Sequence, residues 1–170
     1  MKAIPWAVAL TVLAASAWAD QRTIDSDPGT DFGAFRTFTV REGKLAARAA
    51  ELNSPLTRKK IDEGIRAALS GHGLSEVPAQ PDLFVQWRFG AADKREIQTW
   101  AVGRWGRGRR VSAYNYTEGT LIVDLYERSG RELVWRGIYR DDESHPDRIA
   151  NRIGDDIKKL FKDFPPKVKK

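Results

Sequence analysis

Four stretches of the chain show the pattern of apolar and β-branched residues that is typical of strands. Residues 83–89 carry an apolar residue at every second position, and residues 120–127 and 132–140 show a similar alternation on either side of a Ser-Gly pair. A period of two predicts strands with one buried face, and the Ser-Gly pair predicts the turn of a hairpin between the last two. Residues 36–40, rich in threonine, phenylalanine and valine, predict a further strand.

Other stretches carry apolar residues at the spacing of a helix. Residues 54–71 open with a serine and a proline, the residue types of an N-cap and a first helical position, followed by an apolar stripe. Residues 146–164 show the same period and predict a last helix. The acidic residues 141–143 are expected in a solvated loop before it. The alanine-rich residues 44–52 favour a short additional helical segment.

This order of elements predicts an α+β domain with two layers. A strand–helix–strand crossover comes first, an antiparallel meander follows, and the last helix closes the chain. We expect a mixed β-sheet of about four to five strands with two main helices packed on one face. About 150 residues are enough for one domain with one core. The expected organisation is therefore a single globular domain over residues 20–166 with a basic tail at 167–170.

The first 19 residues have the parts of a cleavable secretory signal. Lys2 is followed by an uncharged, mostly apolar core, and alanines stand at positions 17 and 19 before Asp20. The core is shorter than the roughly 20 residues that a membrane-spanning helix needs. We therefore expect cleavage after Ala19, a mature chain without a transmembrane segment, and a periplasmic or secreted location, with peripheral association with the outer membrane as an option.

The chain contains no cysteine, which narrows the chemistry. Without a thiol there is no disulfide, and the lipid attachment of bacterial lipoproteins is not expected. The two histidines, His72 and His145, stand at predicted helix ends and have no second ligand at helical spacing. The acidic residues 141–143 lack the alternation and central glycine of a calcium loop. The sequence predicts neither a metal site nor a cofactor.

Positive charge is concentrated in two places. The chain has a formal net charge of +6, yet residues 94–110 (KREIQTWAVGRWGRGRR) alone hold six basic residues and one acid, and the lysine-rich residues 158–170 form the second basic region. Two basic regions on an otherwise mildly acidic body create a localised field. The candidate binding residues of the first stretch are Lys94, Arg95, Trp100, Arg104, Trp105, Arg107, Arg109 and Arg110.

Two interpretations of residues 94–110 stay open. The stretch is either a glycine-containing hairpin extension with solubilising arginines, or a binding site for an anionic surface of the cell envelope. Tryptophan favours membrane interfaces, and basic residues favour anionic lipid, lipopolysaccharide or acidic polysaccharide. Arginine and tryptophan also suit nucleic acid, but an exported protein does not meet the nucleic acid of the cytoplasm. The oligomeric state is not predicted by the sequence.

Asp82 and Asp124 are the carboxylates with the strongest case for a special role, because both stand in or beside apolar strands. Aspartate is disfavoured within a strand, so Asp124 is expected to have a cationic partner. Arg136 is the preferred candidate for a structural ion pair, with Arg88 as the alternative. No G-x-S-x-G nucleophile motif is present. We therefore expect that the protein is not an enzyme and has no catalytic residues.

Several short motifs follow one another in the order of a known family. They are DPGTDF and FRTF within residues 27–38, PDLFV at 81–85, EGTLIVD at 118–124, LVWRG at 133–137 and FPP at 164–166. Together they resemble the bacterial cell-envelope family known as domain-of-unknown-function family 4136, over residues 24–166. The resemblance implies an envelope protein without an established activity. Many members carry a lipid-attachment cysteine that this chain lacks, so soluble periplasmic residence is expected.

The functional prediction is an exported, non-catalytic periplasmic or envelope domain that serves as a binding or accessory module. One alternative is a binder of anionic lipid, lipopolysaccharide or polysaccharide through residues 94–110. The other is an uncharacterised hydrolase that depends on Asp82 or Asp124. The expected partners are an anionic envelope surface or another envelope protein.

Overall fold

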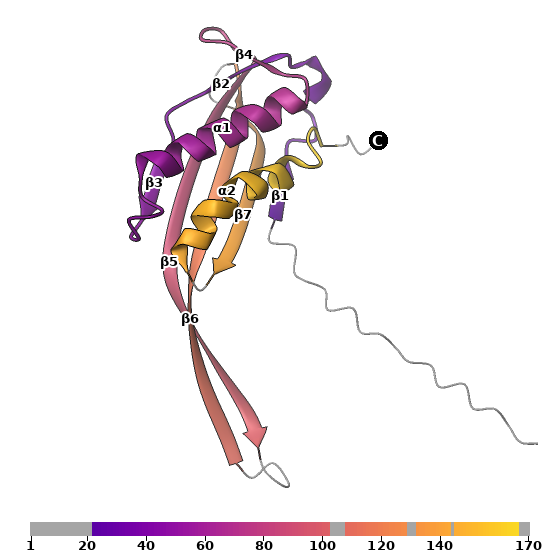
Figure 1. Ribbon diagram of the computed structural model, residues 1–170. Coiled ribbons are helices and arrows are strands. Elements are labelled where there is room, and N and C mark those ends of the chain that lie inside the picture. The colour runs from indigo at the N-terminus through magenta and orange to yellow at the C-terminus, as the bar shows by residue number, and fades with distance from the viewer. Residues whose placement is uncertain (1–21, 103–107, 129–131, 144, 167–170) are drawn as a thin grey trace, which may run out of the picture.

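A computed structural model describes residues 22–102, 108–128, 132–143 and 145–166, with only the backbone described at 96, 98–102, 108–112, 114 and 116. One mixed sheet lies under two helices (Figure 1). The elements are β1 (Arg22–Ser26), the 3-10 helix η1 (Phe32–Ala34), β2 (Thr37–Val40), β3 (Lys44–Ala47), α1 (Pro55–Gly71), β4 (Ser75–Glu76), β5 (Leu83–Val102), β6 (Gly108–Glu127), β7 (Leu133–Glu143) and α2 (Pro146–Phe161).

The sheet combines a parallel side and an antiparallel side. Its strand order is β1-β7-β6-β5-β2-β4, and β3 pairs with β5 farther along the same strand. β5, β6 and β7 form the expected antiparallel meander, and β1 adds to β7, also antiparallel. β2 is parallel to β5, and α1 connects them, so the expected crossover and meander are confirmed.

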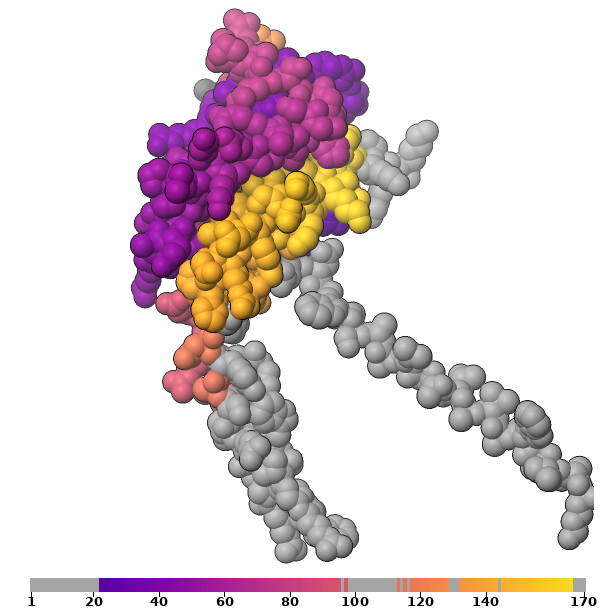
Figure 2. Space-filling view, viewed as in Figure 1, coloured from indigo at the N-terminus to yellow at the C-terminus, as the bar shows by residue number. Residues whose placement is uncertain are grey.

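Both helices cover the same face of the sheet and lie side by side (Figure 2). Ser54 caps α1 by accepting a hydrogen bond from the backbone N–H of Thr57. Between helices and sheet lies an apolar core to which β5, β6, β7, α1 and α2 contribute. Its largest fully buried side chains are Trp87 and Trp135, and the Trp135 ring stacks on Phe161 with 5.0 Å between ring centroids. No helix among the described residues is long and apolar enough to span a membrane.

The sheet has seven strands, more than the four to five expected. Two of the additional strands give no apolar alternation: β1 is polar and lies at an edge, and β4 has only two residues. The third, β3, corrects the helix favoured over residues 44–52. Lys44–Ala47 pair with Arg88–Ala91 of β5, so sheet hydrogen bonds override the helix propensity of alanine there. Between β2 and β3, Gly43 lies against Trp87, where an added Cβ would overlap the indole ring.

The prediction for the acidic residues 141–143 is also corrected by the structure. They were expected in a solvated loop, but they form the end of β7 and pair with residues 117–119 of β6. Asp141 is buried, because it continues the alternation of Trp135 and Tyr139 onto the face that the helices cover. The alternating pattern of β7 thus extends one step into residues whose charge argued for a loop.

Candidate binding arm and the charged face of the sheet

The β5–β6 hairpin continues far beyond the rest of the sheet (Figure 1). β3 ends opposite Ala91 of β5, and β7 ends opposite Thr117 of β6. Beyond that point nine register pairs, from Lys94↔Tyr116 to Val102↔Gly108, join only β5 and β6 within the described part of the chain. We call residues 94–102 and 108–116 the arm. At about 3.4 Å per residue, nine residues reach about 30 Å from the body.

The arm contains part of the predicted basic stretch. Lys94 and Arg95 have exposed side chains at its base, and Ile97 is an apolar side chain that is 62% exposed. Trp100, Arg109 and Arg110 lie in the paired backbone, with Trp100 in register with Arg110. Their side chains, and all of Arg104, Trp105 and Arg107, lie outside the described residues. Among the described residues, Lys94, Arg95, Trp100, Arg109 and Arg110 therefore lie on the paired strands β5 and β6.

Carboxylates gather where the arm leaves the sheet. Asp93 accepts a hydrogen bond from the Thr117 hydroxyl at 3.1 Å, and Lys94 lies 3.8 Å from the Glu118 carboxylate. The pKa of Asp142 is raised, first by burial and then by the negative charges of Glu118 and Asp141. The root of the arm, where Asp93, Glu118 and Asp142 lie, is thus acidic, whereas the sequence of its outer part is basic.

The sheet face opposite the helices carries the predicted ion pair. Arg136 donates to both oxygens of Asp124, at 2.6 Å from Nε and 2.9 Å from Nη2, and Arg88 donates to Asp124 Oδ2 at 2.9 Å. The carboxylate is buried while both guanidinium groups stay partly exposed. The hydrogen bonds to Asp124 raise the pKa of Arg136. Both arginines considered from the sequence therefore bind the same carboxylate, and Asp124 holds three strands together.

Asp82, the other carboxylate considered for catalysis, is a structural acceptor. Its Oδ2 accepts hydrogen bonds from the backbone N–H groups of Arg36 and Thr37 and from the Thr37 hydroxyl, each at 2.9 Å. The hydrogen bond from Arg36, followed by that from the Thr37 hydroxyl, lowers the pKa of Asp82. This arrangement fixes the start of β2 against the start of β5. Asp82 and Asp124 are held by different partners and do not form a carboxylate pair.

The histidines are likewise engaged in structure. The ring Nε2 of His72 lies 2.9 Å from the carbonyl oxygen of Phe161, which connects the ends of the two helices. His145 occupies the N-cap position of α2. Within the described residues, no three side chains of histidine, cysteine, aspartate or glutamate come close enough together to hold a metal ion.

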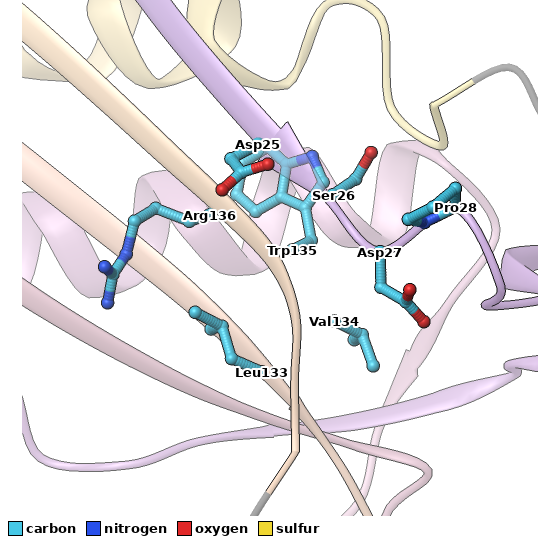
Figure 3. Close-up of a pocket in the computed structure, with 8 residues that line it drawn as sticks. All are labelled: Asp25, Ser26, Asp27, Pro28, Leu133, Val134, Trp135 and Arg136. Carbon is cyan, nitrogen blue, oxygen red and sulfur yellow. The ribbon is translucent and has the colours of Figure 1, made fainter.

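A hollow of about 260 Å³ lies where β1 meets the bulged start of β7. Figure 3 shows that the Arg136 guanidinium points away from Asp27 and Pro28. Asp27 accepts hydrogen bonds from Gly29 N–H and from the Thr30 hydroxyl, so its carboxylate is used in a turn. Two of the polar side chains that line this hollow, Asp27 and Arg136, thus have hydrogen-bond partners within the fold.

Sequence reasoning missed two buried carboxylates, Asp141 and Asp156. Both stand at positions that fit the apolar period of their strand or helix, but a charged residue at such a position was not expected to be buried. Asp141 follows the alternating strand positions of Tyr139, and Asp156 occupies a position in the apolar helical stripe that begins at Ile149. A polar residue at an apolar position is the pattern that could have revealed them.

With the fold and these surfaces described, the chain can be placed among known proteins. A family model described as domain of unknown function (DUF4136) matches residues 22–166. The chain belongs to the DUF4136 family. The match covers every element of the fold from β1 to α2, so the family assignment expected from the sequence motifs is confirmed. A search of curated proteins found no match.

Solved structures share the fold at low sequence identity. A DUF4136 protein from Bacteroides thetaiotaomicron has 13% identity and a TM-score of 0.54, over 85% of this chain and 95% of that one. A PDZ domain protein from Parabacteroides distasonis has 16% identity and a TM-score of 0.56, over 86% of this chain but only 35% of that one. A putative neuraminyllactose-binding hemagglutinin homolog from Helicobacter pylori has 13% identity and a TM-score of 0.51, over 79% and 86%. These likenesses concern the fold alone.

Proposed function

We propose that this DUF4136 domain is a non-catalytic binding module of the cell envelope and that the arm is its binding element. The observation that carries the proposal is the length of β5 and β6 beyond the sheet, nine register pairs with no other strand beside them among the described residues. Isolated two-stranded hairpins are marginally stable in water. A partner surface that covers the arm would bury its side chains and so stabilise it.

The arm's composition favours an anionic partner. Residues 94–110 hold six basic residues and one acid, and the acids of the root lie behind them, toward the body. Each basic residue near an anionic lipid surface contributes about 1 kcal/mol of attraction. Tryptophan, present twice in the stretch, is enriched at membrane–water interfaces. Anionic lipid or lipopolysaccharide is therefore the partner class that the arm fits best.

Two further observations support a non-catalytic, exported module. Asp82, Asp124 and His72 each have a structural partner that fixes strands or helices to one another. The first 19 residues have the composition of a secretory signal, and the family resemblance is to envelope proteins. Envelope location and the absence of catalysis remain parts of the proposal.

Co-sedimentation tests the proposal. The expected mature chain, residues 20–170, is mixed with vesicles containing anionic lipid, and separately with lipopolysaccharide, over a range of salt concentrations. The arm variant changes Arg104, Arg107, Arg109 and Arg110 to glutamine. The matched control changes four exposed basic residues of the body to glutamine, and these are Lys59, Arg128, Lys158 and Lys162.

We expect salt-sensitive binding that falls about 100-fold or more in the arm variant, because about 1 kcal/mol per arginine is lost. The control variant should bind within a few-fold of the unchanged protein. Equal losses of binding in both variants would show that binding depends on the net charge of the protein and not on the arm. Absence of binding by all three proteins would refute the anionic surface and make another envelope protein the partner to seek.

A further inference from the structure

A hollow of about 630 Å³ lies between the edge strand β1 and the end of α2 (Figure 1). Arg22, Lys162 and Asp163 contribute charged groups to it. A hollow of this size, with mainly apolar walls and a few charged groups, is typical of binding pockets. We call this hollow and the outer edge of β1 beside it the edge groove. Its apolar walls comprise Ile24, Trp135, Leu160, Phe164, Pro165 and Pro166.

The walls of the edge groove are fixed to one another within the fold. Arg22 of β1 donates to the carbonyl oxygen of Lys159 at 3.0 Å and to Asp163 Oδ2 at 2.8 Å, so it ties β1 to the end of α2. The ring of Phe164 packs edge-on against Trp135, with 5.7 Å between ring centroids. The groove is therefore formed without a ligand, which limits the conformational entropy that binding costs.

β1 has one side on which no strand pairs with it among the described residues. The backbone N–H of Asp27 donates to the carbonyl oxygen of Val134 at 3.0 Å, just beyond the last register pair of β1 and β7. In an antiparallel ladder every second residue bonds to the same neighbour. The backbone groups of Ile24 and Ser26 therefore point outward, away from β7. Such an edge can receive a further strand.

Ile24 joins this outer edge to the hollow. Its backbone groups point outward, while its side chain is 38% exposed and lines the hollow. In an antiparallel pair the side chains of directly opposite residues lie on the same face. A residue of an added strand that stands opposite Ile24 would therefore face the hollow. Backbone donors and acceptors in a row recognise an extended peptide, and the apolar hollow beside them suits one large apolar side chain.

The charge of this region favours an acidic peptide. Arg22 and Lys162 line the groove together with one acid, Asp163, which pairs with Arg22. The last turn of α2 adds Lys158, whose side chain is 77% exposed, and the sequence continues after Pro166 with Lys-Val-Lys-Lys. Complementary charges speed association and select among partners. The second basic region of the sequence thus belongs to the same end of the molecule as the groove.

We propose that the edge groove binds an extended acidic peptide segment of a partner protein. The segment adds to β1 as an antiparallel strand and places a large apolar side chain in the hollow. The site is independent of the binding function proposed for the arm. α2 begins shortly after β7 ends beside the root of the arm, and its 16 residues, about 24 Å of helix, lead from there to the groove.

A designed peptide tests the proposal. The probe is fluorescently labelled acetyl-Thr-Glu-Val-Phe-Val-Glu-Thr-amide, in which phenylalanine and both glutamates share one face, and fluorescence anisotropy measures its binding to residues 20–170. Replacing phenylalanine by alanine should weaken binding about tenfold or more, because the apolar side chain is lost. N-methylation of the phenylalanine should weaken it about fivefold, because the donor to the Ile24 carbonyl is removed. Replacing both glutamates by lysine should weaken it about fivefold.

Variants of the protein locate the bound peptide. Ile24→Pro removes the outward N–H, which an edge strand tolerates, whereas Ile24→Ala keeps it. The proline variant should bind the probe about fivefold more weakly than the alanine variant. Lys162→Glu should weaken binding of the acidic probe and strengthen binding of its lysine version. The matched control is Lys59→Glu, an exposed position on α1, which should leave both affinities unchanged.

Several outcomes would overturn the proposal. They are absence of binding at millimolar protein, equal affinity for the phenylalanine and alanine probes, and equal affinity for the acidic and lysine probes. Binding that is the same in Ile24→Pro and Ile24→Ala would show that β1 does not pair with the peptide. Sedimentation equilibrium tests the remaining occupant: a dimer of the unchanged chain that Ile24→Pro abolishes would show that a second copy covers β1, in place of a partner peptide.

Discussion

Strands β5 and β6 pair with each other along their whole length, yet they pass through two different environments. In the body, Val85, Trp87 and Val123 are buried between the sheet and the helices, and further strands pair on either side. In the arm, the same two strands have no other neighbour among the described residues, and Ile97 is largely exposed. One continuous ladder of hydrogen bonds therefore serves both the most buried and the most exposed part of the sheet.

The difference shows that hydrogen-bond pairing alone does not decide what a strand contributes. Backbone hydrogen bonds replace bonds to water and give a net of about 0.5–1.5 kcal/mol each, whereas burial of large apolar side chains supplies the main stabilisation. We therefore expect substitutions in the body part of the hairpin to act on folding. Substitutions in the arm should act on binding and leave folding nearly unchanged.

The largest expected effect is the loss of the Trp87 side chain. Trp87 is 2% exposed, and its indole N–H donates to Asp62 Oδ1 of α1 at 2.7 Å. Trp87→Ala should lower the free energy of unfolding by about 3–5 kcal/mol, measured by urea denaturation. Ile97→Ala, on the arm portion of the same strand, should change it by about 0.5 kcal/mol or less. Comparable losses for the two variants would contradict the division into body and arm.

A smaller difference is expected for two carboxylates of β6. Asp124→Ala removes the acceptor of Arg88 and Arg136 and should lower the free energy of unfolding by about 1–2 kcal/mol, since both arginines are partly exposed and solvent compensates in part. Glu118→Ala, at the root of the arm, loses only a 3.8 Å contact to Lys94 and should cost about 0.5 kcal/mol or less. Chemical denaturation at neutral pH measures both, and an equal cost would show that the ion network adds nothing to ordinary surface charge.

The parts of the fold that were predictable from sequence are those where one face is buried. The alternation of residues 83–89 and the helical stripe of residues 146–161 arise because one side of each element meets the core. β1 gave no such signal, because it is a polar edge strand stabilised by pairing with β7. β3 was obscured by alanine, whose helix propensity is overridden by pairing with β5. Edge strands depend on their neighbours, which a local pattern does not contain.

The candidate sites divide in the same way. The partnership of Asp124 with arginine could be anticipated, because an aspartate within a strand needs a cation and arginines stand at matching positions on neighbouring strands. The basic composition of the arm was also visible in the sequence. A hairpin extension over residues 94–110 was one of the two interpretations that the sequence left open, but how far β5 and β6 continue past the ends of β3 and β7 could not be predicted. That length depends on where other strands stop, and Asp141 and Asp156 were missed because only the packing of α2 brings them together.

The most direct test of the comparison is removal of the arm, which should affect stability less than Trp87→Ala or Asp124→Ala. Asp93 and Thr117 are in register, so residues 94–116 can be replaced by Asn-Gly, which favours the two-residue turn of a hairpin. The free energy of unfolding should stay within about 1 kcal/mol of the original, because no described side chain of the core is lost and the shorter loop costs less entropy to close. Binding to anionic vesicles should be abolished. Urea denaturation and co-sedimentation of the same preparation measure the two properties together. A variant that no longer unfolds cooperatively would make the arm part of the folding unit, whereas a stable variant that still binds would move the binding surface to the body.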